Sequence, residues 1–102
     1  MLASFSIVPV GSGEELKTAV AEAVDIVDRS GLSYAVGAMN TTVEGEEHEV
    51  LSLILACHHA VRKKVRRVLT TITIDDREGA ERRLSGKVDD VEGVLGRRLH
   101  RG

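Results

Sequence analysis

The densest group of polar side chains in the first half of the sequence is the run Asn40-Thr41-Thr42-Val43-Glu44-Gly45. An asparagine amide offers both a donor and an acceptor, so it can bind a heterocycle that carries a ring nitrogen beside an amino group. The carboxylate of Glu44 can attract a cationic part of the same ligand. The alternative is ordinary turn chemistry followed by an acidic helix start, and the spacing alone favours that alternative.

The other reactive side chains do not form a catalytic or metal-binding constellation. His48 and His59 point in similar directions on an expected helix, but a rise of about 1.5 Å per residue places them about 16 Å apart. His58 and His59 are neighbours that diverge around the helix, so packing or solvent-facing roles are favoured over metal ligation. Cys57 is the single cysteine, and we expect a buried thiol. We therefore predict no catalytic residues and no metal site.

Length and composition limit the class of protein. The chain has 102 residues, of which 42% are hydrophobic and 29% are charged, and this is typical of one globular domain over residues 1–102. Phe5 and Tyr34 are the only aromatic residues. The stacking surfaces that single-stranded nucleic-acid binders use are therefore nearly absent, and we predict no nucleic-acid partner.

Charge is unevenly distributed along the chain. Residues 1–61 carry two basic and nine acidic groups, whereas residues 62–102 carry twelve basic and seven acidic groups. Because the acidic groups of the second half are interspersed among the basic ones, a solvated surface is favoured over a nucleic-acid-binding tail. No run approaches the roughly 18 apolar residues of a membrane span, and no basic region precedes the apolar N-terminal stretch. We expect no membrane association and a cytoplasmic location.

Hydrophobic periodicity predicts the order of the secondary structure elements. Alternation with a period of two indicates strands, and apolar residues three and four apart indicate helices. Glycines weaken the last expected helix, which must gain its stability from packing. The expected strands cover residues 2–8, 32–39, 41–44 and 68–74, and the expected helices run from a capping-box sequence at 12–15 to about 30, from 46 to 64, and from about 85 onward.

This order, βαββαβ followed by a C-terminal helix, predicts an α+β, ferredoxin-like sandwich with a four-stranded antiparallel sheet and two helices on one face. The face away from those helices is predicted to be uncharged, although sheet faces in water usually carry Lys, Glu or Arg. We therefore predict that a second copy covers this face, giving a homodimer or homotetramer with a pocket; an exposed Thr-rich face is the alternative. The residues expected on this face are Ser4, Ser6, Leu69, Thr71 and Thr73.

The segment Ser33-Tyr34-Ala35-Val36-Gly37-Ala38-Met39-Asn40-Thr41-Thr42-Val43-Glu44-Gly45 resembles the hairpin signature of the small thiamine-binding family, formerly classed as uncharacterised (UPF0045, DUF77). The strand ends Val8-Pro9-Val10-Gly11 and Ile72-Thr73-Ile74-Asp75-Asp76-Arg77 also look like those of this family. The resemblance implies ferredoxin-like subunits that form dimers or tetramers by sheet packing. It also implies binding of thiamine or its hydroxymethylpyrimidine part without known catalysis, which reverses the preference for plain turn chemistry.

On this resemblance, ligand contact is expected at Asn40-Thr41-Thr42 and at Glu44, with Ser6 and Tyr34 added as neighbours by the expected strand geometry. The sequence thus predicts a non-enzymatic protein that binds thiamine or hydroxymethylpyrimidine at a subunit-interface pocket, requires no cofactor, and serves sequestration, buffering or sensing. The alternative is a structural module whose sheet face only mediates homo-oligomerisation. An enzyme is a third possibility that rests on fold analogy alone.

Overall fold

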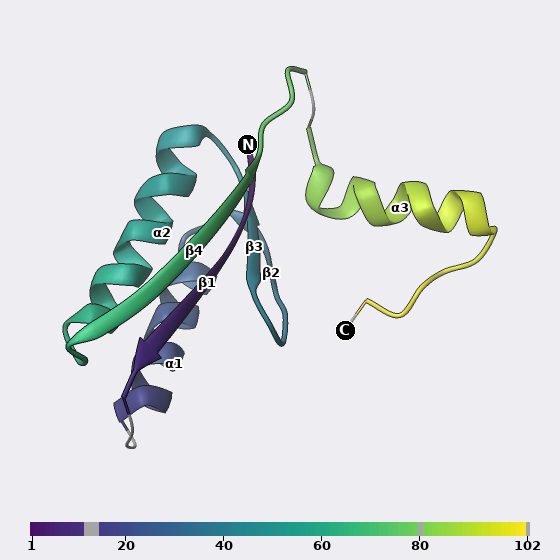
Figure 1. Cartoon of the computed structure of the whole chain (residues 1–102). Coiled ribbons are helices and arrows are strands. Elements are labelled where there is room, and N and C mark those ends of the chain that lie inside the picture. Colours follow the sequence, from purple (N-terminus) through teal and green to yellow (C-terminus); the bar gives the residue numbers. More distant parts are fainter. Residues whose placement is uncertain (12–14, 80, 102) are drawn as a thin grey trace.

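The computed structural model describes residues 1–11, 15–79 and 81–101 (Figure 1). Its element order confirms the predicted ferredoxin-like α+β plan with an added C-terminal helix. Most of the capping-box sequence at residues 12–15 lies outside the described residues. In chain order the elements are β1 (Leu2–Val10), α1 (Glu15–Arg29), β2 (Ser33–Val36), β3 (Thr41–Glu44), α2 (Glu47–Arg62), β4 (Arg67–Asp75) and α3 (Arg83–Leu95).

The sheet has the strand order β2-β3-β1-β4, and all neighbouring strands are antiparallel. β1 pairs with β4 along its whole length, from Leu2 opposite Asp75 to Val10 opposite Arg67. Its pairing with β3 covers only Leu2 to Phe5, because the β2–β3 hairpin is much shorter than β1. The second half of β1 is therefore paired on one side only.

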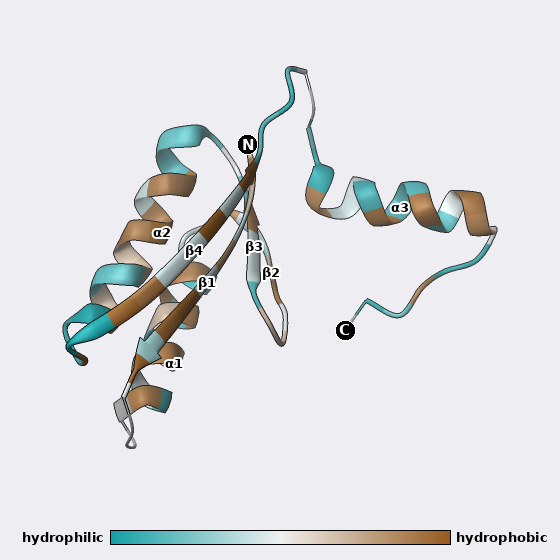
Figure 2. Cartoon of the chain, in the orientation of Figure 1, coloured by the Kyte–Doolittle hydropathy of each residue, from teal (hydrophilic) through white to brown (hydrophobic). Residues whose placement is uncertain are grey.

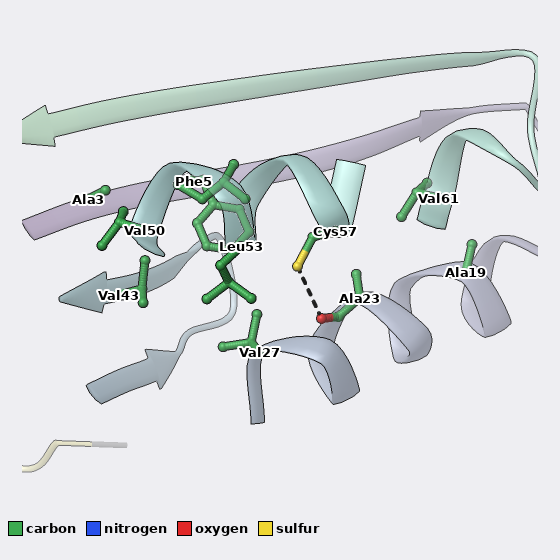
Figure 3. Close-up of a cluster of buried hydrophobic side chains, with 11 residues drawn as sticks. Ala3, Phe5, Ala19, Ala23, Val27, Val43, Val50, Leu53, Cys57 and Val61 are labelled. Carbon is green, nitrogen blue, oxygen red and sulfur yellow. Dashed lines mark hydrogen bonds between the residues drawn. The ribbon is translucent and has the colours of Figure 1, made fainter. Parts of the chain in front are cut away.

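Helices α1 and α2 cover one face of the sheet (Figure 1). Their apolar sides and the inward-facing residues of β1 and β3 form a core in which aliphatic side chains predominate, as the composition predicts (Figures 2 and 3). The buried residues are Ala3, Phe5, Ala19, Ala23, Val27, Val43, Val50, Leu53, Ile54, Cys57 and Val61.

The opposite face of the sheet is uncharged in its middle, as the alternation predicts, whereas its ends carry Glu44 and Asp75 beside Leu2, and Arg67 beside Val10. In the register, Ser4 lies beside Thr42 on β3 and Thr73 on β4, and Ser6 lies opposite Thr71. Since directly paired residues share a face, these hydroxyl side chains form one uncharged surface. We call this surface, with Leu69, the neutral face.

Helix α3 lies on the side of the sheet away from α1 and α2 and extends outward from it (Figure 1). It contacts β2 and β3 and begins at Arg83, two residues before the start that the sequence predicts. None of the helices in the described part of the chain combines the length and the apolar character needed to cross a bilayer.

Candidate functional site

A cavity of about 210 Å³ lies between the second half of β1, the β2–β3 hairpin and helix α1. It forms where β1 continues past its last pair with β3, Phe5 opposite Thr41, so that the hairpin no longer closes against β1. We call it the hairpin cavity. Its lining residues, apart from Phe5 and the buried Val61 of α2, are Ser6, Ile7 and Val8 of β1, Val20, Ala23, Val24 and Val27 of α1, and Val36, Gly37, Ala38, Met39, Asn40 and Thr41 of the hairpin.

Three polar residues line the hairpin cavity: Ser6, Asn40 and Thr41. Asn40 is placed there by a tight turn, in which the backbone N–H of Gly37 donates to the carbonyl oxygen of Asn40 at 2.8 Å. A Cβ atom on residue 37 would lie only 3.0 Å from that oxygen, so glycine permits the close approach of the two strands. Three of the sequence-predicted ligand residues therefore meet at one cavity.

The side chain of Asn40 reaches back to the central strand. Its Nδ2 donates a hydrogen bond to Oγ of Ser4 at 2.7 Å. This bond joins the hairpin to β1 on the neutral face, and it ties down the side chain of a residue that lines the cavity.

The volume and chemistry of the hairpin cavity suit one small ring. A cavity of about 150 Å³ accommodates a benzene-sized molecule, whereas sites for drug-sized ligands start at about 300 Å³; the value here, about 210 Å³, lies between them. Most of the lining is aliphatic, and no charged side chain of the described residues lines it. The cavity can therefore hold an uncharged heterocycle whose polar edge faces Ser6, Asn40 or Thr41.

Three of the predicted ligand residues, Tyr34, Thr42 and Glu44, lie outside this cavity. Tyr34 is paired with the buried Val43 and so points to the helix side, where its hydroxyl donates to the carboxylate of Asp28 on α1. That hydrogen bond to a carboxylate raises the pKa of Tyr34. Thr42 lies on the neutral face between Ser4 and Ala35. The sheet thus separates Tyr34 and Thr42 onto opposite faces.

Glu44 has partners within the chain, at the start of α3. Its carboxylate oxygens accept the backbone N–H groups of Arg83 at 2.7 Å and Leu84 at 3.2 Å. These are free donors at the start of α3, where a negative charge also interacts favourably with the helix dipole. Glu44 is four residues beyond Asn40, about 13 Å along an extended strand, and it does not line the hairpin cavity. Within the chain it anchors α3.

Sequence reasoning placed Ser4 on the neutral face but missed its hydrogen bond to Asn40, and it missed Val24 as part of the cavity lining. The alternation of β1 does place Ser4 on the same face as Ser6, which was a usable signal. Val24 lies beside the buried Ala23 but is only partly buried, so periodicity assigns it to the flank of the core. Its place in the cavity depends on how far the hairpin stands from α1.

The remaining reactive side chains have structural environments. The thiol of Cys57 is buried and donates to the carbonyl oxygen of Ala23 at 3.4 Å, and burial raises its pKa to about 11. This confirms the expected buried thiol. Nδ1 of His58 lies 2.6 Å from Oγ1 of Thr70, which joins α2 to β4. Within residues 1–11, 15–79 and 81–101, no three His, Cys, Asp or Glu side chains gather closely enough to hold a metal ion.

Residues 3–92 match the family model described as thiamine-binding protein. The chain belongs to this family. Among curated relatives, the UPF0045 protein Mb1933 of Mycobacterium bovis is 36% identical over 96 residues, which cover 93% of this chain and 94% of that protein. The UPF0045 protein MJ1052 of Methanocaldococcus jannaschii is 30% identical over 91 residues, covering 89% and 91% of the two chains.

Solved structures of the family agree with the fold. The crystal structure of MJ1052 superimposes with a TM-score of 0.79 at 29% identity and covers 88% of this chain and 93% of its own. A Thermotoga maritima protein provisionally assigned to thiamine biosynthesis or salvage gives a TM-score of 0.77 at 26% identity, covering 88% of this chain and 96% of its own. Thiamine-binding family membership, expected from the hairpin sequence, and the ferredoxin-like fold, expected from the order of the elements, are therefore confirmed.

Proposed function

We propose that this protein binds a thiamine-type ligand without transforming it, and that the aminopyrimidine ring occupies the hairpin cavity. Membership of the thiamine-binding family supports the ligand class. The observation that carries the proposal is the ring-sized aliphatic cavity bordered by Asn40. Sequestration, buffering or sensing are the roles consistent with binding alone.

The ring would pack against aliphatic side chains of α1, and its polar edge would meet Asn40, Ser6 or Thr41. Apolar burial supplies affinity, and the few polar groups supply orientation. A volume of about 210 Å³ holds the pyrimidine, so the thiazolium of intact thiamine would extend out of the cavity. Tyr34, Thr42 and Glu44 have no direct ligand contact in this proposal.

We further propose that a second copy covers the neutral face, so that the protein is a homodimer or homotetramer. The face combines uncharged hydroxyls with exposed apolar side chains, among them Val8 and Leu69 at 51% and 49% exposure. Contiguous exposed apolar surface usually marks an interaction site. Ser6 belongs both to this face and to the cavity lining, so a partner copy would approach the mouth of the cavity. The cytoplasmic location expected from the sequence stays a prediction.

Calorimetry with hydroxymethylpyrimidine and with thiamine tests the binding proposal. We expect the wild-type protein to bind both, and Asn40→Ala to weaken both by about five- to tenfold, as for one lost hydrogen bond. Ser33→Ala is the matched control, since it removes a polar group of β2 that does not line the cavity. Absence of binding heat and of a thermal shift at millimolar ligand refutes the proposal. If the protein then binds neither ligand but is an oligomer by light scattering, the alternative function, a structural module that only mediates homo-oligomerisation, is indicated.

A further inference from the structure

Strand β4 ends the sheet, and no strand in the described part of the chain pairs with its outer edge. Natural edge strands are usually short or carry a charge, a proline or a bulge, because an open row of main-chain N–H and C=O groups pairs readily with another strand. β4 is nine residues long, and its one-to-one pairing with β1 contains no bulge. From Val68 to Ile74 it has no charged residue and no proline. The outer edge of β4 is therefore open to pairing.

Apolar side chains beside this edge are only partly covered. Ile72 is paired with the buried Phe5 of β1, so it lies on the helix side of the sheet, yet it is 38% exposed. Ile74, on the same side, is 46% exposed. Leu55 of α2, the helix that contacts β4 from this side, is exposed as well. A second sheet beside β4 would remove part of this apolar surface from water.

The two ends of β4 carry opposite charges. Arg66 and Arg67 precede the uncharged stretch, and Asp75 and Asp76 follow it. Figure 2 shows apolar and neutral segments alternating along β4, with hydrophilic residues at both ends. Asp75 pairs with Lys87, whereas the other three form no ion pair with any described residue. A strand with one basic and one acidic end attracts a second copy of itself in the antiparallel direction.

Antiparallel pairing of two β4 strands about Thr71 matches these charges. Arg67 and Asp75 each lie four residues from Thr71, and Arg66 and Asp76 each lie five. In such a pair, Arg67 of one copy is directly opposite Asp75 of the other, and Arg66 is opposite Asp76. Two-fold symmetry repeats both ion pairs at the other end. A shift of one or two residues in either direction keeps at most one ion pair at each end.

We propose that the outer edge of β4 is an interface with a second copy of this chain, in which the two β4 strands pair antiparallel about Thr71 and join the two sheets into one. This contact uses the edge of the sheet, whereas the neutral face is its flat side, so a protein that uses both surfaces is a tetramer. Leu69 lies on both surfaces, and a charge there would disturb both contacts. The inference goes beyond ligand binding, because β4 and the β2–β3 hairpin lie at opposite ends of the strand order.

Thr71→Cys in the full chain tests the register. Residues directly opposite each other have Cα atoms about 4.5–5.5 Å apart, within the range of about 4.4–6.8 Å for a disulfide. Mild oxidation should therefore give a covalent dimer on a non-reducing gel. Sheets packed face to face lie about 10 Å apart, too far for the neutral face to give the same product.

Thr73→Cys is the matched control, because it changes another exposed threonine on the same face of β4. In the proposed pair its two copies are four residues out of line, about 13 Å apart, so they should not form a disulfide. Cys57 is buried, and the wild-type protein, oxidised in the same way, should stay without a covalent dimer.

Arg67→Glu tests the ion pairs. It places a carboxylate opposite Asp75 at both ends of the interface, and the dissociation constant of the edge contact should rise about tenfold or more. Light scattering over a dilution series measures this change. Adding Asp75→Lys to Arg67→Glu restores opposite charges in the same register and should recover association. Lys63→Glu is the control, since it makes the same change of charge at an exposed residue outside the paired stretch.

The outcomes are decisive for the edge contact. A covalent dimer of Thr71→Cys but not of Thr73→Cys, with loss and recovery of association in the charge variants, supports it. No covalent dimer of Thr71→Cys, or equal yields from both cysteines, refutes the pairing. Unchanged association of Arg67→Glu, or no recovery on adding Asp75→Lys, refutes the register. Pyrimidine binding by Arg67→Glu should equal that of wild type, so this interface and the proposed function are tested separately.

Discussion

Replacing Glu44 tests whether this carboxylate holds α3 or contacts a ligand. The carboxylate accepts two backbone N–H groups, those of Arg83 and Leu84. Loss of a side-chain acceptor at a helix start costs about 0.5–2 kcal/mol, and loss of the charge near the helix dipole adds about 0.3–1 kcal/mol. We therefore expect Glu44→Ala to destabilise α3 by about 1–3 kcal/mol. Glu44→Gln keeps one acceptor oxygen, so its stability should lie between those of wild type and Glu44→Ala.

Hydrogen exchange is the assay, because α3 contacts the rest of the chain mainly through β2, β3 and the ion pair between Lys87 and Asp75 of β4, and it should open on its own. A loss of about 1–3 kcal/mol corresponds to about 5- to 150-fold faster exchange of the amides of residues 83–95. The amides of α1 and α2 should keep their protection, since the buried core does not include α3. Glu46→Gln is the control, as Glu46 makes no side-chain capping bond to α2.

Two results would refute this reasoning. Unchanged exchange of α3 in Glu44→Ala would show that the carboxylate does not anchor the helix. A selective loss of affinity for intact thiamine in Glu44→Gln, with α3 still protected, would show instead that Glu44 meets the thiazolium cation, as the sequence suggested.

Three further predictions concern the thiol, the cavity and the neutral face. Burial raises the pKa of Cys57 from 9.0 to about 11, so the stability that the protonated thiol contributes is complete below pH 9 and is lost as the pH rises through 11. The contribution of this thiol to the slope of the unfolding free energy against pH is at most about 1.4 kcal/mol per pH unit. Urea unfolding of wild type and Cys57→Ala at pH 8 to 11 should show this contribution in wild type alone. Equal slopes in the two proteins would contradict the prediction. Val24→Phe should fill the hairpin cavity and weaken pyrimidine binding at least tenfold while the fold persists, as measured by calorimetry and circular dichroism; undiminished affinity would place the ligand elsewhere. Leu69→Glu should reduce the mass measured by light scattering to that of a monomer, and an unchanged mass would exclude the neutral face as the interface.

Hydrophobic periodicity predicted the helices and strands well because each of them is determined by residues that are close together in the sequence. β3 covers Thr41–Glu44, as expected, and the neutral face follows from a period of two that brings Ser4 and Ser6 to one side. The side of the sheet to which Tyr34 points was harder to predict, because the sequence did not fix the register of the expected strand 32–39. The turn closed by Gly37 and Asn40 sets that register, and it directs Tyr34 to the helix side.

The parts of the site that the sequence did not reveal depend on contacts between distant segments. The partners of Glu44 are 39 and 40 residues away along the chain, and only the path of the segment before α3 brings them close. The hairpin cavity arises from a difference in length between β1 and the hairpin, and no single residue encodes that difference. The polar residues at the cavity could therefore be predicted, but the cavity itself could not.

The one-sided pairing of β1 bears on how any ligand is recognised. From Ser6 to Val10 this strand pairs with β4 alone, so main-chain amides and carbonyls along its free edge face the cavity region. Such groups persist through every side-chain replacement. We expect an alanine scan of the lining to account for only part of the binding free energy, because main-chain N–H and C=O groups would make some of the contacts with the ligand.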